Sequence, residues 1–491
     1  MMLGIDGVTV TEAEREPGGR LTVWAKVTAP AACPGCGTVS ERVHQYVLTA
    51  PRDVRVCGED ADLFLVRRRM ECVVPGCGTG TFTEWVPQLP PRCSITRRLL
   101  AHAGAEVAER GITPAEAARH NRISWPSAHG AFTQAAGRLL GDEIAPVAYL
   151  GIDEHRRGRP RWRKNTDTGE YVQLADRWHT CFYDLSGSQG MLGQVEGRTA
   201  DDAAYWLAGA TRDWRDAVEI VAIDMCTIYL SAVKRMLPHA QVAVDLFHVV
   251  QLAVKTTGDV RRRAIREKYG RRGKAGDPEY GIKHLLERNL ENLSPDDFAK
   301  IIDVLDASAE GQQVALAWIA KEKLRDALKL RARVTGSTPG ERRVRDKLYS
   351  FYDWCAQNDQ VSELTTLAAT ISRWEDQIVT AVITGVTNAT SESLNRLAKL
   401  EARLAYGFRN PANQRRRVRI ACTPGTRRRT VTHRNNATKS NHATARPRLT
   451  SKAPITSSLS FVVRADDRDR GLRPDVRLGK PVRGAVDAAR A

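Results

Sequence analysis

The sequence has no long hydrophobic run and a deficit of acidic residues. No stretch approaches the roughly 20 apolar residues that a membrane span needs, and the N-terminus, MMLGIDGVTV, lacks the basic segment and apolar run of a secretion signal. These absences predict a protein that stays in the cytoplasm and has no membrane partner. With 57 Asp and Glu against 75 Lys and Arg, the formal net charge is +18. Such a charge favours a polyanionic partner, most commonly nucleic acid.

Cysteine is also scarce, since ten residues in 491 are too few for a disulfide scaffold. Four of them form two closely spaced pairs: Cys33 with Cys36, and Cys72 with Cys77. Each pair includes a Pro-Gly turn, in which glycine permits the tight bend that aims two thiolates at one ion. Four thiolates make the closed tetrahedral set of a structural zinc site. His44 or Cys57 could replace one of these ligands, and four reduced, buried cysteines would leave the repeated Pro-Gly turns unexplained.

The length and the changes of composition along the chain predict several domains. Residues 1–90 read as short strands and turns, with β-rich stretches at Leu21–Val27 and Ala61–Arg69, and we assign them to a zinc ribbon. Residues 91–142 read as helices, and residues 143–418 as an α/β domain with a helical insertion at about 250–370. Residues 419–491 are rich in Arg, Thr, Ser and Asn without periodicity, which predicts a basic, disordered tail.

Three helical segments are predicted between residues 94 and 140. Arg97–Arg110 has apolar residues at about 3.6 spacing and ends at Gly111, while Thr113-Pro114-Ala115-Glu116 and Ser124 begin two further helices. This is the layout of a helix-turn-helix, whose second helix lies in a DNA major groove, although any three-helix packing unit gives the same pattern. The residues expected to contact DNA are Arg119, Arg122, Ser124, Trp125, Ser127 and His129.

Apolar strands that end in aspartate mark the next segment. VAYLGID ends at Asp153, AVEIVAID ends at Asp224, and AQVAVD ends at Asp245. With two β-type segments at Trp178–Leu185 and Met191–Val195, their order is that of an RNase-H-like mixed sheet. The carboxyl ends of parallel strands lie side by side, so the first two aspartates could share one pocket, although such acids also cap helices.

A third acid on a following helix would complete an oxygen site for Mg²⁺. Two metal ions held about 3.5–4 Å apart can activate the attacking oxygen and stabilise the leaving oxygen of a phosphodiester. Glu154 follows Asp153 directly, and strand alternation predicts that it points to the opposite face, outside the metal set.

Four motifs resemble those of the DDE insertion-sequence transposases of the ISL-three family, over roughly residues 30–422. They are CPGC…ECVVPGCGTGTFTE, LGIDE, VAIDMCTIYLSAVKRMLPHAQVAVDLFHVV and TNATSESLNRLAKLEARLAYGFRN. The resemblance implies a zinc ribbon, a helix-turn-helix and an RNase-H-like catalytic domain. It has no counterpart for residues 450–491.

The resemblance also implies roles for individual residues. The catalytic acids would be Asp153, Asp224 and Glu392, holding Mg²⁺ or Mn²⁺, with Glu401 as the alternative third acid. The auxiliary residues would be Asp245, His248, Asn388 and Asn395. The first two belong to an Asp-x-x-His motif in which this chain has Leu246 instead of the usual Arg.

The function expected from this resemblance is transposition. The protein would bind the terminal inverted repeats of its own insertion sequence as a homo-oligomer on double-stranded DNA, cleave there, and join the freed end to target DNA. It would work at the nucleoid of a prokaryotic cytoplasm. Two other functions fit parts of the sequence: a non-catalytic zinc-ribbon and helix-turn-helix regulator, and an RNase-H-like nuclease that cuts without joining.

Overall fold

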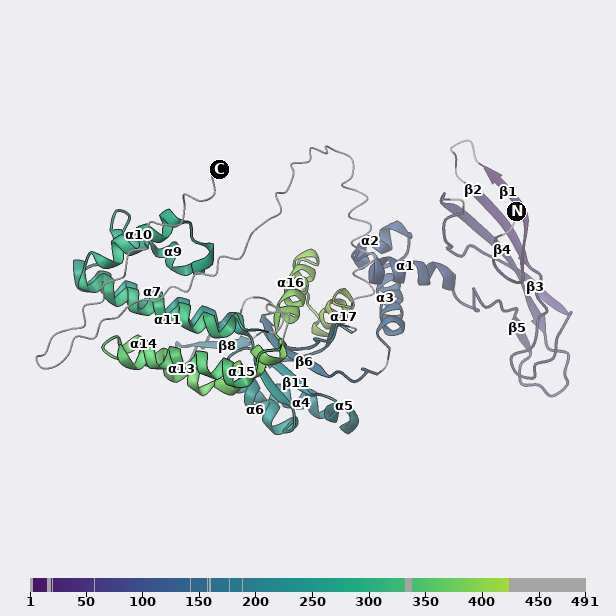
Figure 1. The fold of residues 1–491 in the computed structure, drawn as a ribbon. Helices are drawn as coiled ribbons and strands as arrows, with labels where there is room; N and C mark the ends of the chain where they lie inside the picture. Colours follow the sequence, from purple (N-terminus) through teal and green to yellow (C-terminus); the bar gives the residue numbers. More distant parts are fainter. Residues whose placement is uncertain are drawn as a thin grey trace, which may run out of the picture.

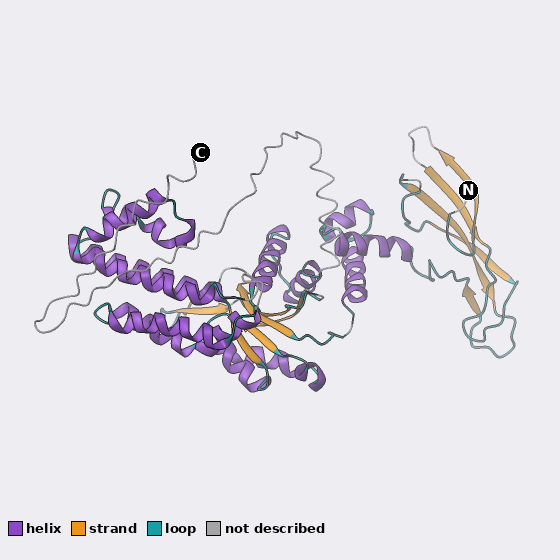
Figure 2. Cartoon of the chain, viewed as in Figure 1, coloured by secondary structure: helices purple, strands orange, loops and turns teal. Residues whose placement is uncertain are grey.

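The computed structural model describes residues 3–15, 19, 21–56, 58–141, 143–156, 158, 160–175, 177–187, 189–331 and 338–423. Cys57 and nearly all of the basic tail lie outside these residues. Figure 1 shows a β-rich N-terminal unit, then helices α1–α3, then an α/β unit with long helices. The alternation of helices and strands in Figure 2 confirms a multidomain α/β chain. Within the described residues, no helix combines the length and apolar character needed to cross a membrane.

The N-terminal unit is a five-stranded sheet in the order β1-β2-β4-β3, with β5 paired to β4. The strands are β1 (Val8–Arg15), β2 (Leu21–Val27), β3 (Val43–Thr49), β4 (Ala61–Glu71) and β5 (Thr81–Thr83). Both predicted β-rich stretches are therefore strands, β2 and β4, and they pair in parallel. Alternate residues of β2 are buried, which gives this unit its own small core.

Three capped helices follow, close to the predicted positions. They are α1 (Arg97–Glu109), α2 (Pro114–His120) and α3 (Trp125–Leu140). The side chains of Thr96, Thr113 and Ser124 accept hydrogen bonds from backbone N–H groups of the first turns, which otherwise lack partners. Helices α1 and α3 pack closely at Gly104, where an added Cβ would lie 2.5 Å from the carbonyl oxygen of Ala131.

The second sheet has the order β10-β9-β6-β11-β12. Its strands are β6 (Tyr149–Arg156), β9 (Trp178–Asp184), β10 (Met191–Glu196), β11 (Ile220–Ile223) and β12 (Gln241–Val244). Strands β6, β11 and β12 are parallel, whereas β9 and β10 are antiparallel to their neighbours. A separate hairpin, β7 (Arg161–Lys164) and β8 (Tyr171–Ala175), lies between β6 and β9 in the chain.

Helices cover both faces of this sheet. Alternate residues of β9 belong to two cores: Phe182 packs with α4 (Ala200–Ala208), α5 (Arg212–Asp216) and α6 (Thr227–Met236), while Cys181 and Tyr183 pack with the last two helices. Those helices are α16 (Ala389–Leu404) and α17 (Pro411–Ala421). Helix α17 continues three residues past 418, so the folded part extends beyond the predicted start of the tail.

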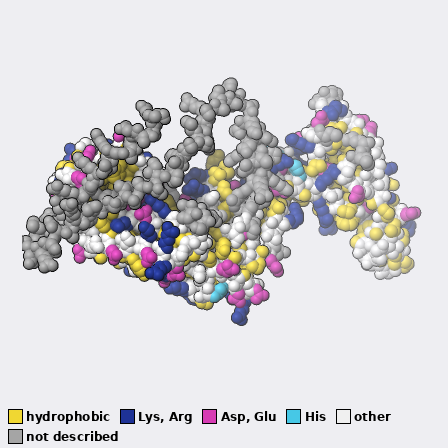
Figure 3. All heavy atoms as spheres, in the orientation of Figure 1, with side chains coloured by type: hydrophobic (Ala, Val, Ile, Leu, Met, Phe, Trp, Pro, Cys, Tyr) yellow, Lys and Arg dark blue, Asp and Glu magenta, His cyan; other side chains and the backbone are white. Residues whose placement is uncertain are grey.

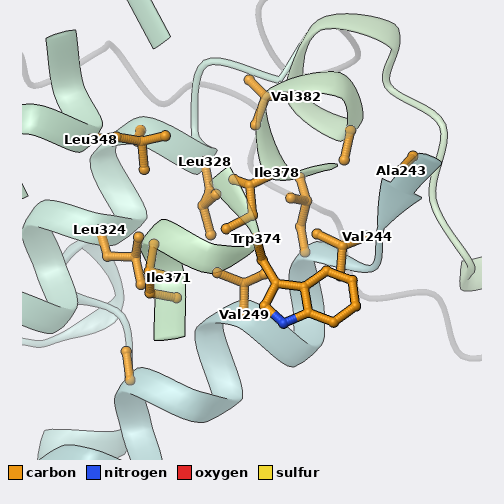
Figure 4. Close-up of a cluster of buried hydrophobic side chains, with 14 of the residues drawn as sticks. Ala243, Val244, Val249, Leu324, Leu328, Leu348, Ile371, Trp374, Ile378 and Val382 are labelled. Atoms are coloured by element: carbon orange, nitrogen blue, oxygen red, sulfur yellow. The ribbon is translucent and has the colours of Figure 1, made fainter. Parts of the chain in front are cut away.

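The helical insertion extends the core of the sheet. Its helices are α7 (Leu246–Tyr269), α8 (Pro278–Gly281), α9 (Lys283–Glu287), η1 (Leu290–Asn292), α10 (Pro295–Asp306), α11 (Ala309–Leu328), α13 (Glu341–Gln357), α14 (Ser362–Arg373) and α15 (Glu375–Thr384). Figure 4 shows Trp374 and Ile378 beside Val244 of β12 and Val249 of α7. This continuous packing holds the end of β12 firmly in place.

Arg417 of α17 joins the three-helix unit to the α/β unit. Its guanidinium forms an ion pair of 2.8 Å with Glu401 of α16 and donates to the carbonyl oxygens of Val107, Gly111 and Ile112 at 2.7–3.2 Å. Both charged side chains are nearly buried, and the three carbonyls belong to the end of α1 and the turn after it. One side chain therefore holds three helices at a fixed distance.

We expect Arg417→Met to destabilise this junction, because it leaves Glu401 as a buried carboxylate without a partner. Breaking a buried pair in this way typically lowers the free energy of unfolding by about 3–5 kcal/mol. Urea denaturation would measure the loss. The matched control is Arg212→Met, whose side chain is 86% exposed in its pair with Asp216 and should matter little. Equal midpoints for the two variants would contradict this role of Arg417.

Candidate active site and zinc centre

Three aspartates form a row at the carboxyl edge of the second sheet. Strand β11 runs parallel to β6 with Ala222 opposite Gly151, and β12 runs parallel to β11 with Val244 opposite Ile223. Continued by one or two residues, this register places Asp224 between Asp153 and Asp245. The sheet thus brings together the first two acids predicted from the sequence and adds the auxiliary Asp245 beside them.

Two of the three acids predicted to be catalytic have raised pKa values. Burial, followed by the negative charge of Asp224, raises the pKa of Asp153 to about 7. Burial also raises the pKa of Asp224, against the opposing influence of His248. The fold therefore holds two carboxyl groups close together where ionisation is unfavourable, and a divalent cation would reverse that cost.

Helix α16 contacts both acids through two asparagines. The side-chain Nδ2 of Asn388 donates to Asp224 Oδ1 at 3.3 Å and to the backbone oxygen of Ile152, also at 3.3 Å. The Nδ2 of Asn395 donates to Asp153 Oδ2 at 2.5 Å. Asn388 and Asn395 are seven residues apart, which is nearly two helical turns, so both side-chain amides face the sheet.

Sequence reasoning missed the residues that orient Asn395. Its Oδ1 accepts a hydrogen bond from the hydroxyl of Tyr183 and lies 3.2 Å from His155 Nδ1, which is 3.1 Å from the Sγ of Cys181. Burial lowers the pKa of His155 to about 4, so the ring is neutral at pH 7. The sequence offered one signal for His155, which is its spacing from Asp153. The two residues are two positions apart on a strand, and residues at that spacing lie on the same face of the sheet.

Asp245 and His248 form, together with Asp224, a cluster of possible metal ligands with oxygen and nitrogen atoms. His248 Nδ1 lies 3.1 Å from Asp245 Oδ2, and its Nε2 lies 3.4 Å from Asp224 Oδ2. One ligand atom from each residue lies within 4.8 Å of the others. The hydrogen bond with Asp245 raises the pKa of His248. Carboxylate oxygens suit Mg²⁺ or Mn²⁺, so the residues present fit a hard divalent cation.

The structure does not bring Glu392 into contact with the aspartates. Its side chain is 54% exposed and pairs with Arg396 of the same helix at 2.6 Å. The alternative third acid, Glu401, is held by Arg417 away from this site. Glu154 accepts a hydrogen bond from Tyr229 of α6 at 2.5 Å, so its side chain lies on the face opposite to Asp153, as strand alternation predicts.

The residues predicted to contact DNA divide into two groups. Arg119, Ser124 and Trp125 are exposed around the start of α3, and Ser127 lies 2.8 Å from Ser124 through their hydroxyl oxygens. Two others face neighbouring units. The Nη2 of Arg122 donates to the Ala61 carbonyl oxygen at 3.4 Å, and the His129 ring stacks on Trp125 and lies near Arg416 of α17. Figure 3 shows Lys and Arg side chains on the three-helix unit and the adjoining N-terminal unit.

The four paired cysteines converge on one point. Cys33 Sγ lies 3.9 Å from Cys77 Sγ, and Cys36 Sγ lies 3.6 Å from Cys72 Sγ. Four sulfurs at 2.3 Å around a tetrahedral zinc ion would be about 3.8 Å apart, so the cluster fits this ion. His44 is not part of this cluster and pairs with Glu71 at 3.3 Å. Cys57 lies outside the described residues.

Comparison with known proteins agrees with this arrangement. The family model of DDE transposases of the ISL3 type matches residues 150–418, more than half of the chain. The chain belongs to the ISL3 family of transposases. A second model, the zinc finger of the transposases IS204/IS1001/IS1096/IS1165, matches residues 29–74. That match includes three of the clustered cysteines, and Cys77, the fourth ligand predicted from the sequence, lies in the same cluster.

Individual relatives of this transposase are also insertion-sequence transposases. It is 24% identical over 415 residues to the transposase for insertion sequence element IS1001 of Bordetella parapertussis, covering 82% of this chain and 92% of the relative. It is 29% identical over 215 residues to the transposase for IS1557 of Mycobacterium tuberculosis, covering 39% and 45%.

We expect Cys72→Ser to release the metal from the cysteine cluster and to loosen the N-terminal sheet, because the free energy of metal binding contributes to folding. Metal analysis after dialysis, together with a thermal melt, would measure both effects. Cys93→Ser is the control, since Cys93 is an exposed cysteine outside the cluster. It should retain about one zinc ion per chain. Equal zinc content in the two variants would show that the cluster holds no structural metal.

We also expect the stability of the protein without added Mg²⁺ to fall as the pH rises from about 4 to about 7. In this range Asp153 is ionised in the unfolded chain but protonated in the folded one, because its folded pKa is about 7. The asparagine of the Asp153→Asn variant cannot ionise. The variant should therefore lose this part of the dependence of stability on pH and be more stable than the wild type at pH 8. Urea midpoints at pH 5 and pH 8 would test this, and identical pH dependence would contradict it.

Proposed function

We propose that this transposase cleaves and joins DNA at a metal-dependent site formed by Asp153, Asp224 and Glu392. One observation carries the proposal: two acids lie side by side on neighbouring parallel strands, and the helix that bears Glu392 donates a hydrogen bond to each of them. The strand order supports an RNase-H-like catalytic domain, because three antiparallel strands precede two parallel ones with helices on both faces.

Glu392 would join the two aspartates by a change of side-chain rotamer. Its present partner, Arg396, is an exposed residue four positions along the helix. Pairs of this kind contribute only about 0.3–0.5 kcal/mol, so a bound cation would readily displace the arginine. Asn388 and Asn395, by contrast, are buried and hold the aspartates. We therefore assign the asparagines to positioning and Glu392 to the metal set.

The proposed reaction uses two phosphoryl transfers without a covalent protein intermediate. Water first attacks the phosphodiester at the element's end, which frees a 3′-hydroxyl, and this hydroxyl then attacks a phosphodiester of the target DNA. Bound Mg²⁺ or Mn²⁺ would lower the pKa of the attacking oxygen and stabilise the leaving one. Asp153, Asp224 and Glu392 would hold the ions, and Asp245 would orient His248 toward Asp224 and the scissile phosphate.

Recognition of the element's ends is assigned to the N-terminal zinc ribbon and to a helix-turn-helix formed by α2 and α3. The exposed start of α3, with Ser124 and Trp125, would enter the major groove, and Arg119 would contact phosphate. Arg122 and His129 would support this surface from behind, since they face neighbouring units in the protein alone. Because two element ends must be joined to one target, the active form on DNA would be a homo-oligomer.

We expect Asp153→Asn, Asp224→Asn and Glu392→Gln each to reduce cleavage and strand transfer by roughly 10³-fold or more, with non-additive losses, because the three residues serve one shared site. Specific binding to the ends should persist, since the elements assigned to end recognition lie within residues 1–142. The assay scores 3′-hydroxyl release and joining on labelled ends. The control is Asp216→Asn, an exposed acid of α5 that pairs with Arg212.

The outcomes separate the possible functions. Full activity in Asp153→Asn or Asp224→Asn would overturn the mechanism, whereas full activity in Glu392→Gln would move the third acid, with Glu401 next to be tested. A wild-type protein that binds without cutting would be a regulator. One that cuts without joining would be a nuclease.

A further inference from the structure

A cavity of about 330 Å³ lies where the three-helix unit meets the α/β unit. Figure 1 shows α3 and α17 near one another at this junction. Its lining includes Leu140 at the end of α3, Ile144 just after it, Gly193 of β10 and Trp206 of α4. The indole packs closely on the strand, since a Cβ on Gly193 would lie 2.4 Å from its Nε1. The cavity is therefore bounded by elements of both units.

Three arginines of α17 also line this cavity: Arg415, Arg416 and Arg419. None of the described lining residues is acidic, and within the described part of the chain none of these guanidiniums forms an ion pair. Arg417 of the same helix behaves differently, because its charge is neutralised by Glu401. Three positive charges thus face one cavity, and the described residues of its walls carry no compensating negative charge.

Arg419 is partly withdrawn from solvent. Its Nε is buried without a hydrogen-bond partner among the described groups, and burial lowers the pKa of the guanidinium. A desolvated cation without a partner is unfavourable unless an anion joins it. The planar guanidinium matches the geometry of phosphate oxygens, and several such groups converge here.

We propose that this cavity binds a backbone phosphate of the DNA held by the three-helix unit. The inference rests on the proposed function, in which DNA is the substrate. Helix α3 has 16 residues, so its exposed start and the cavity at its end are about 24 Å apart. Phosphates of one strand are spaced about 3.4 Å apart along the duplex axis, so a duplex that runs along α3 can offer a phosphate to the cavity about seven base pairs from the start of this helix.

A phosphate in this position would connect recognition with catalysis. It would contact α17, which packs on the catalytic sheet, while the same duplex contacts the start of α3. The DNA would then be aligned on both units by one contact that is independent of sequence. Such a contact contributes affinity by releasing counterions and so has a measurable salt dependence.

The test is Arg419→Met in the full chain, which keeps the length of the side chain and removes its charge. Binding of a duplex of about 30 base pairs and arbitrary sequence is measured from low to moderate salt. We expect the slope of log K against log salt to fall in magnitude by about 1 and the affinity at low salt to fall about tenfold. Arg212→Met removes the same charge from an exposed position and should keep the wild-type slope.

A second measurement separates an anion site from a structural arginine. Without added anions, Arg419→Met should melt at or above the wild-type temperature, because it removes a desolvated charge. Inorganic phosphate should raise the melting temperature of the wild type more than that of the variant. An unchanged salt slope, or a variant that melts well below the wild type, would overturn the inference.

The failure of the inference and the failure of the proposed function give different results. If the wild type binds the duplex and Arg419→Met binds it with the same slope, the cavity is no DNA site and the proposed function stands. If phosphate protects only the wild type and no DNA is bound, the cavity holds free phosphate. The inference and the proposed function then both fail.

Discussion

The close packing of helix α16 on strand β6 determines the geometry of the candidate active site. Gly151 makes it possible, since a Cβ at this position would lie 2.4 Å from Ser391 Oγ and 3.2 Å from Asn388 Oδ1. Because the helix lies this close, Asn388 and Asn395 reach the two acids at the strand ends. A larger residue at Gly151 would separate the helix from the sheet and release both carboxylates.

The core of the sheet and the helical insertion keep the acids together against their own repulsion. The same hydrophobic cluster includes β6, β11 and β12 and continues through α7, α11, α13 and α15. Burial and mutual repulsion make ionisation of Asp153 unfavourable, a cost that the large apolar core offsets. The site is thereby preorganised for cations, and no rearrangement of the backbone is needed to bring the two acids together.

Helix α17 has two different roles along its length. Arg417 points toward Glu401 and the carbonyls at the end of α1, which fixes the three-helix unit on the catalytic unit. Arg415, Arg416 and Arg419 instead line a cavity that has no acidic described residue. Neighbouring arginines on one helix thus have different roles. Arg417 joins two units of the protein, whereas the other three make the cavity positively charged. What separates them is whether a carboxylate lies within reach.

The sequence by itself determined the features that depend on near neighbours. Cap residues and apolar spacing located α1, α2 and α3, the Pro-Gly turns identified the cysteine cluster, and apolar runs ending in Asp153 and Asp224 identified two acids. Only the tertiary structure decided which distant side chains meet. It placed Asp245 in the row of acids and joined Asn395 to Tyr183 and His155. It also left Glu392 paired with Arg396. Arg122 and His129 are turned toward neighbouring units. Caps and periodicity act within a few residues, whereas Asn395 meets His155 across 240 positions, and contacts at that separation depend on how whole helices and sheets pack.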